Sequence, residues 1–279
     1  MLTSLKPRML LLFVTLALIG SCRETSPTSP PRADNTADAM QIAELRARLD
    51  ALEERKRRIE DSNAIKRLQR AYAYYMEEAL WDEVLQLFSE DATFEFARDG
   101  VYVGKARIRD YLHALGDGQQ GLREGQLTDH LMLMPVLTLA DDGMTARARW
   151  NTIMLLGTHG MEASWGEGPY ENEYVKEDGI WRISKLRWFQ TIRVPYEGGW
   201  AKHEDINKGI WVSDTLPPDA PPTTPYGSWP ETFLPPFSFA NPVARYVPPA
   251  TPAPSGTTED VMPATTDEPV AETAAGAAQ

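Results

Sequence analysis

The sequence predicts an α+β fold in which a strongly bent antiparallel sheet has helices on one face. Apolar residues recur at helical spacing through residues 63–88, and they alternate with polar residues directly afterwards, at 91–96. A second helical pattern occupies residues 105–115. Two Asp-Gly turn signals, at 142–143 and 178–179, then separate long strands, which is typical of antiparallel hairpins.

The first helix is predicted from apolar residues that fall on one face, and it continues to a stop near Ser89. The residues of this face are Ile65, Leu68, Tyr72, Tyr75, Met76, Leu80, Trp81, Val84, Leu85 and Phe88. After Asp91 the period changes to two, with Phe94 and Phe96 on one side of a half-buried strand.

The later elements follow the same two periods. A short extended segment is expected at residues 100–104, before the second helix. Glycines at 116, 118, 121 and 125 predict a connection or lid, because they lack the strand-to-helix context of a phosphate-binding loop. The longer strands are expected at residues 128–140, 144–158, 168–176 and 180–194.

The amino terminus reads as a secretory signal over residues 1–22, with basic residues followed by a short apolar run. The run ends in Leu-Ile-Gly-Ser before Cys22, which resembles a bacterial lipobox, and this cysteine is the only one in the chain. We therefore expect lipidation of Cys22 and attachment to the membrane, an ordinary cleaved signal being the alternative. Arg23, not Asp, follows the cysteine, which favours a periplasm-facing lipoprotein of the outer membrane over the inner one.

Two segments separate this anchor from the domain. Residues 23–39 are rich in Ser, Thr and Pro and are predicted to be a disordered tether. Residues 40–61 carry Ile and Leu at heptad spacing, over about three heptads. This helix either packs on its own domain or forms a coiled coil, so we expect a homo-oligomer, whether dimeric or linked by the coiled coil.

The domain is expected to span residues 62–210, where prolines are scarce. Residues 211–247 combine prolines with aromatic residues and are predicted to lie in extended form over the domain or over a partner. Residues 248–279 lack aromatics and basic residues and are predicted to be a disordered acidic tail.

Composition excludes several functions. A formal net charge of −12 opposes nucleic-acid binding by a basic surface. Four scattered histidines (His113, His130, His159 and His203) and a single cysteine give no metal-ligand spacing. The sequence also lacks a Gly-x-Ser-x-Gly elbow, a P-loop and a dinucleotide fingerprint. We therefore expect no metal and no cofactor.

The order of residues in the first helix resembles the SnoaL-like group of the nuclear-transport-factor-2-like superfamily. The resembling places are held by Tyr72, Glu77, Trp81, Leu87 and Phe88, with Glu90 and Asp91 in the turn, and the likeness extends over residues 62–200. The resemblance implies a cone-shaped sheet, open at one end, with a pocket between sheet and helices.

The same resemblance implies an acid and base pair. Glu77 stands where dehydratases and isomerases of this group often have an Asp, although the longer side chain puts a direct transfer of that role in question. His130 stands where the scytalone-dehydratase branch has an active-site histidine. We take Glu77 and His130 as the candidate catalytic residues, the alternative for Glu77 being a solvent-facing or ion-paired carboxylate.

Aromatic and amide side chains are the candidate pocket wall, with core packing as the alternative for each. The candidate substrate-binding residues are Tyr72, Trp81, Trp150, Asn172 and Trp188. Two functions fit these residues. One is binding of a small hydrophobic molecule, with cofactor-independent dehydration or isomerisation by general acid and base. The other is a noncatalytic binding or oligomeric scaffold lipoprotein.

Overall fold

The computed structural model describes residues 35–242, so the signal segment with Cys22, most of the predicted tether and the acidic tail lie outside the described residues. The chain divides into two compact units, Met1–Glu54 and Arg55–Gln279. Helix α1 (Asn35–Glu77) begins in the first unit and ends in the second. The predicted tether therefore ends earlier than expected, since residues 35–39 are helical.

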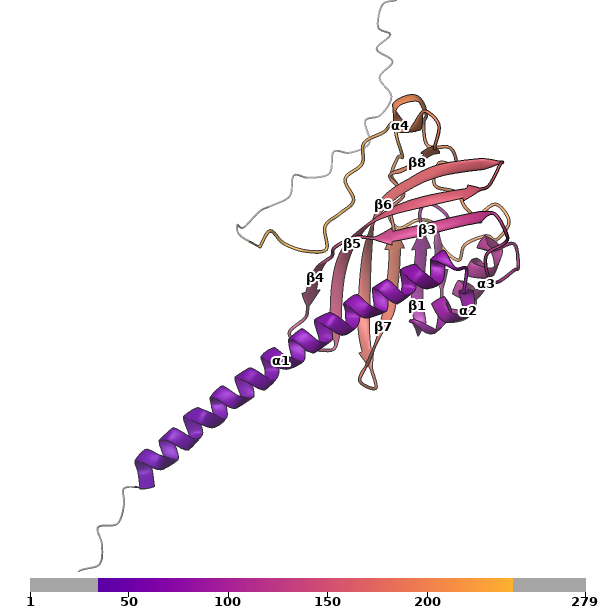
Figure 1. The fold of residues 1–279 in the computed structure, drawn as a ribbon. Coiled ribbons are helices and arrows are strands. Elements are labelled where there is room, and N and C mark those ends of the chain that lie inside the picture. The colour runs from indigo at the N-terminus through magenta and orange to yellow at the C-terminus, as the bar shows by residue number, and fades with distance from the viewer. Residues whose placement is uncertain (1–34, 243–279) are drawn as a thin grey trace, which may run out of the picture. The chain divides into compact units, whose positions relative to one another are not determined.

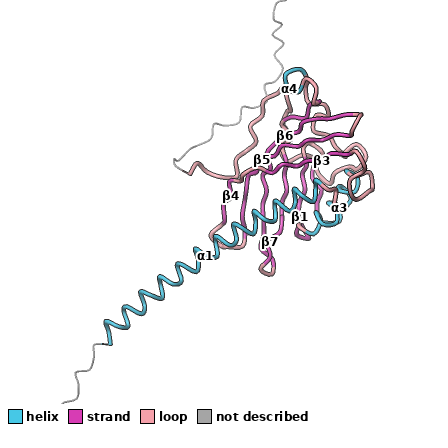
Figure 2. Tube along the Cα trace, in the orientation of Figure 1, coloured by secondary structure: helices cyan, strands magenta, loops and turns pink. Residues whose placement is uncertain are grey.

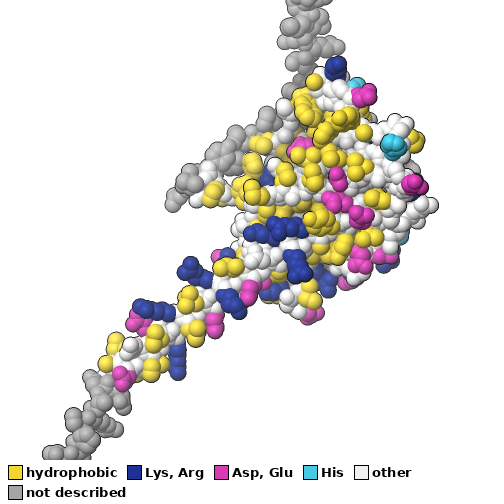
Figure 3. Space-filling model, in the orientation of Figure 1, with side chains coloured by type: hydrophobic (Ala, Val, Ile, Leu, Met, Phe, Trp, Pro, Cys, Tyr) yellow, Lys and Arg dark blue, Asp and Glu magenta, His cyan; other side chains and the backbone are white. Residues whose placement is uncertain are grey.

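The described part of the first unit is a single stretch of helix, residues 35–54. Its heptad residues are exposed, with Leu45, Leu49 and Leu52 keeping 54–60% of their accessible surface. Apolar side chains and basic side chains succeed one another along this helix in Figure 3. No helix within residues 35–242 is long and apolar enough to cross a membrane.

The second unit is built on an eight-stranded sheet in the order β2-β1-β7-β6-β5-β3, with β4 on β5 and β8 on β6 (Figure 1). The strands are β1 (Phe88–Phe96), β2 (Val101–Val103), β3 (Gln126–Met132), β4 (Val136–Leu139), β5 (Thr145–Thr158), β6 (Glu162–Glu177), β7 (Ile180–Trp188) and β8 (Ile192–Pro195). The remaining helices are α2 (Trp81–Gln86), α3 (Lys105–Leu115) and α4 (Gly199–Lys202). This is the predicted α+β fold, a curved sheet with helices that does not close into a barrel.

Several boundaries differ from the prediction. The first helix is interrupted after Glu77, because Ala79 adopts a positive φ of 51°, and α2 begins afresh at Trp81. The predicted strand 128–140 is two strands, β3 and β4, separated by residues 133–135. The sheet is mixed, not purely antiparallel, because β1 and β7 pair in parallel.

The second half of α1 lies across the sheet (Figure 1) and buries one face against it. Its buried residues recur every three or four positions, as a helix packed on one side requires. They are Asp61, Ile65, Gln69, Tyr72, Ala73 and Met76. Asp61 accepts hydrogen bonds from Lys176 Nζ at 2.6 Å and Trp181 Nε1 at 2.8 Å, which joins the helix to β6 and β7.

Residues 211–242, the arm, lie on their own domain with no helix or strand apart from one bridge between Val101 and Ala220 (Figure 2). Buried Asp99 accepts the amide hydrogens of Trp211, Val212 and Ser213 at 2.8–3.1 Å. Further along the arm, the amide and the hydroxyl of Thr223 donate to buried Glu95 at 2.8 and 2.6 Å.

Candidate functional site

The site is built from rows of paired residues that cross the sheet. His130 on β3 lies opposite Met154 on β5, Met154 lies opposite Gly166 on β6, and Gly166 lies opposite Arg193 on β8. Directly paired residues of antiparallel strands point to the same face of a sheet. The side chains of His130, Met154 and Arg193 therefore share one face.

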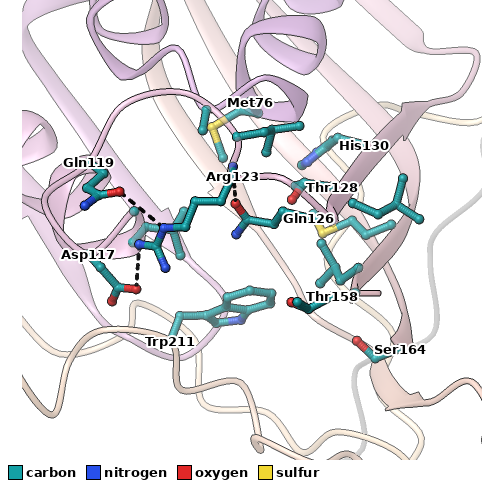
Figure 4. Close-up of a pocket in the computed structure, with 18 of the residues that line it drawn as sticks. Met76, Asp117, Gln119, Arg123, Gln126, Thr128, His130, Thr158, Ser164 and Trp211 are labelled. Atoms are coloured by element: carbon teal, nitrogen blue, oxygen red, sulfur yellow. Dashed lines mark hydrogen bonds and ion pairs between the residues drawn. The ribbon is translucent and has the colours of Figure 1, made fainter. Parts of the chain in front are cut away.

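The neighbouring rows repeat this pattern at a spacing of two residues. Thr128, Leu156 and Ser164 form the next row, and Gln126, Thr158 and Glu162 form the one after it. All of these side chains face a cavity of about 210 Å³, which also touches α2, the loop after α3 and the arm. Its other lining residues are Met76, Ala79, Trp81, Phe96, Leu115, Gly116, Asp117, Gln119, Gly121, Leu122, Arg123, Leu127, Gly157 and Trp211 (Figure 4).

The cavity has a buried floor and an exposed mouth. Trp81, Phe96, His130 and Met154 are each at most 5% exposed. Residues 117–120 and 122–125 of the loop after α3 are exposed, as are the first two residues of β3. Two wider surface depressions have no buried titratable side chain in their lining. The cavity floor is therefore the place where a ligand would lose most contact with water.

The glycine-rich loop is fastened over this mouth. Trp81 Nε1 donates to the carbonyl of Gln119 at 2.7 Å, and the amide of Gly121 donates to the carbonyl of Ala79 at 2.9 Å. Within the loop, the guanidinium of Arg123 pairs with Asp117 at 3.2 Å. The loop is thus held to the turn between α1 and α2, as the predicted connection or lid.

His130 is the titratable group on the cavity floor. Its ring is 3% exposed, and Nε2 shares a hydrogen bond of 2.9 Å with the hydroxyl of Tyr170. Burial lowers the pKa of His130 to about 3, because the charged imidazolium would be poorly solvated there. At neutral pH the floor therefore presents an uncharged imidazole.

Glu77 does not line the cavity. Its carboxylate accepts a hydrogen bond of 3.0 Å from the backbone amide of His130, so the two predicted catalytic residues meet through main chain and not at a shared cavity. Burial raises the pKa of Glu77, the His130 amide lowers it, and Asp129 and Glu78 raise it further. Glu77 thus joins the end of α1 to β3, and Glu78 is exposed.

The predicted pocket wall is also corrected. Of the five candidate substrate-binding residues only Trp81 lines the cavity, because Tyr72, Trp150, Asn172 and Trp188 fill the narrow end of the cone. Trp150 Nε1 donates to Tyr174 at 2.9 Å, and Asn172 bonds Gln69 at 3.0 Å. These four side chains are core. The polar groups of Trp150, Asn172 and Trp188 have core partners, whereas the buried hydroxyl of Tyr72 has no hydrogen-bond partner among the described residues.

Arg193 and Trp211 line the cavity but were absent from the predicted site. Trp211 belongs to the arm. Arg193 lies in the predicted strand 180–194, which the structure divides into β7 and the short strand β8. The available signal was the alternation Ile-Arg-Val within that predicted strand, which places Arg193 on the face opposite to Ile192 and Val194.

Within residues 35–242 no three His, Cys, Asp or Glu side chains are grouped so as to hold a metal ion. The remaining histidines stand apart from the floor. His159 is exposed at the turn after β5, and His113 lies 3.8 Å from Asp82 on the outside of α3. His203 follows α4 and is exposed.

A curved sheet with helices on one face and a cavity toward its open end defines the class of cone-shaped α+β domains. Residues 57–187 match the SnoaL-like domain family. The chain thus carries a SnoaL-like domain over these residues, as its opening helix predicted.

Solved structures resemble the chain over about half its length. Hexachlorocyclohexane dehydrochlorinase LinA-type3 from Novosphingobium barchaimii is 17% identical, with 51% of this chain and 94% of that chain covered and a TM-score of 0.45. A variant of Rv3472, a protein of unknown function from Mycobacterium tuberculosis, is 22% identical, with 50% and 76% covered and a TM-score of 0.41. Similarity at this level says nothing about activity.

Proposed function

We propose that this SnoaL-like domain binds a small, mainly apolar molecule in the 210 Å³ cavity, with one polar group of that molecule hydrogen-bonded to His130. The observation that carries the proposal is the floor, where a buried neutral imidazole stands among Met76, Phe96 and Met154. An uncharged donor or acceptor in an apolar cavity fixes the orientation of a ligand. The volume is below the range of about 300–1,000 Å³ that is usual for drug-sized ligands, so the ligand is small.

A blocked cavity tests this proposal. Met154→Trp places a larger ring at the centre of the floor, whereas Met144→Trp adds the same ring at a position 48% exposed. A set of small carbonyl and hydroxy-ketone compounds would be screened by thermal shift, since a ligand of the folded state raises the melting temperature. We expect stabilisation of the wild type and Met144→Trp but not of Met154→Trp. Equal stabilisation of all three proteins would place binding elsewhere.

Proton transfer is the second candidate function, and the His130–Tyr170 hydrogen bond favours it. That bond orients the ring, so that the other ring nitrogen is available to a ligand on the floor. His130 would accept a proton next to a carbonyl and return it, which gives isomerisation or dehydration without a cofactor. A pKa of about 3 makes His130 a weak base, so a neutral hydrogen-bonding role has the stronger support.

Two substitutions separate these roles. If His130 transfers the proton, His130→Gln abolishes turnover of any compound found in the screen while binding persists. Glu77→Gln keeps an acceptor for the His130 amide, so we expect turnover to fall less than tenfold. A complete loss in Glu77→Gln would restore the acid and base pair that the sequence predicted.

We further propose that the protein is a lipoprotein of the cell envelope, anchored through Cys22 and facing the periplasm. The support is the signal segment and the residues before Cys22. In a bacterial host, Cys22→Ser should move the protein from the membrane fraction to the soluble fraction and abolish labelling by fatty acid. Unchanged fractionation and labelling would contradict lipidation.

The alternative scaffold function rests on the exposed heptad residues. Lysine in place of Leu45, Leu49 and Leu52 would remove an apolar contact between helices of two chains. Light scattering should then report a smaller assembly than for the wild type. A wild-type monomer would contradict the predicted homo-oligomer.

A further inference from the structure

The strongest feature that the proposed function leaves unused is a cation at the end of the cavity opposite His130. Arg193 lines the cavity and is partly buried. Within residues 35–242 its guanidinium has no ion pair and no hydrogen-bond partner, and Nε is completely buried without one. A buried cation that lacks an acceptor is costly, so such a group points to a missing partner.

The position of this guanidinium is fixed by packing. Its central carbon lies 4.3 Å from the centre of the Trp211 ring, a cation–π contact that holds the planar group against the cavity wall. Trp211 is itself held by the bond from its amide to Asp99 and by its Nε1, which donates to Gln190 at 2.8 Å. The fork of donors is therefore in place before a ligand arrives.

Two acids lie near Arg193, and neither forms an ion pair with it. Both carboxylate oxygens of Asp205 accept from Gln190 Nε2 at 2.8 Å, and Glu162 is exposed at the mouth. Burial lowers the pKa of Arg193, while Glu162 and Asp205 raise it. The guanidinium remains charged at neutral pH, because an arginine is not deprotonated in proteins.

The spacing of the row sets the shape of the ligand. His130 and Arg193 are separated by three strand steps, roughly 14 Å between their backbones, from which both side chains reach inward. The two positions between them are Met154 and Gly166, and an added Cβ at Gly166 would lie 3.2 Å from Met154 Cβ. The Met154 side chain therefore lies over the glycine and makes the row apolar between the two polar groups.

We propose that the cavity selects small aromatic or unsaturated carboxylic acids, with the carboxylate on Arg193 and the apolar body over Met154 and Phe96. A planar guanidinium matches a carboxylate through two parallel hydrogen bonds. This inference rests on the proposed binding function and adds the charge of the ligand. Arg193 is then the residue that determines specificity.

The test uses the purified full-length protein and three matched pairs of probes: benzoate, phenylacetate and cinnamate, each with its primary amide. Binding is followed by calorimetry and by tryptophan fluorescence, since Trp81 and Trp211 line the cavity. We expect at least one carboxylate to bind ten times more tightly than its amide. Arg193→Gln should bring the pair within twofold, by weakening the carboxylate alone.

Two further variants keep the test decisive. Arg193→Lys retains the charge without the planar fork, so we expect part of the preference to remain. Arg147→Gln removes an arginine that is 63% exposed on β5 and should keep the full tenfold preference. Melting temperatures of all variants show whether they are folded.

Equal binding of acid and amide by the wild type, or a preference that survives in Arg193→Gln, would overturn the inference and leave the proposed function intact. The same holds if no probe binds but neutral compounds stabilise the wild type and not Met154→Trp. If neither probes nor neutral compounds bind, the inference and the proposed function both fail.

Discussion

The buried imidazole of His130 should make the stability of this protein depend on pH in a way that one substitution removes. The ordinary pKa of a histidine is 6.5, and burial lowers the pKa of His130 to about 3. Between these values the unfolded chain binds a proton at His130 and the folded protein does not. The free energy of unfolding therefore falls as the pH falls from 6.5 toward 3, and the full contribution is present above 6.5.

The magnitude follows from the width of that window. Each pH unit within it changes the free energy of unfolding by about 1.4 kcal/mol. Acidification from pH 7 to pH 5 should therefore remove about 2 kcal/mol of the stability that the protein owes to His130. Carboxylates titrate in the same range in every variant. The quantity of interest is therefore the difference between wild type and His130→Gln, which should shrink by about 2 kcal/mol at pH 5.

Urea unfolding at pH 7 and pH 5, at constant ionic strength, measures this difference. His159→Gln is the matched control, because His159 is exposed, and it should lose as much stability as the wild type. The reasoning is refuted if wild type and His130→Gln lose equal stability between the two pH values. That result would mean that His130 is protonated in the folded state or reached by water.

Three further predictions concern the framework around the cavity. Asp99→Ala removes the acceptor of Tyr111 and of three arm amides and should cost about 3–5 kcal/mol in urea unfolding, whereas exposed Asp91→Ala should stay within about 0.5 kcal/mol. Asp61→Ala leaves a lysine and a tryptophan without their buried acceptor, with an expected loss of about 3 kcal/mol by the same method. Gly168→Ala would bring a Cβ within 1.8 Å of a backbone oxygen, so we expect the melting temperature to fall by about 10 °C or more. Unchanged stability in any of these three variants would contradict the packing described.

Local sequence patterns predicted correctly those elements whose ends are set by nearby glycine or turn residues. Helix α3 has the predicted bounds, 105–115, because a glycine flanks it on each side and one of its faces is apolar. The Asp178-Gly179 turn has φ values of 49° and 80°, which a tight hairpin requires. The break between β3 and β4 was missed although Pro135 stands there, where a proline cannot donate to the ladder.

The site was predicted less completely, and helical geometry explains the error at Glu77. Met76 follows Tyr72 by four residues, about 40° further round the helix, and both are buried. Glu77 follows by five residues, about 140° round, and so leaves that face. His130 was chosen because the resemblance implies an active-site histidine at its position, and it lies within β3 and lines the cavity.

The alternation of apolar and polar residues along a strand also does not show how far a residue lies from the open end of the cone. Trp150 shares a strand and a face with Met154, but it lies further along, among core residues, while Met154 lines the cavity. Arg193 and Trp211 reach the cavity through pairings with distant segments, which a local pattern does not encode.

The bonds between the arm and β1 bear on how a nascent chain reaches its final state. Glu95 bonds Thr223, which follows it by 128 positions, and Asp99 bonds Ser213, which follows it by 114 positions. Contacts so far apart in sequence slow the search for the native arrangement. Synthesis must therefore be almost finished before two buried carboxylates meet their donors in the arm. A protein released early, at the end of the recognised family segment, would keep only Tyr111 as the partner of Asp99 and Arg187 as the partner of Glu95.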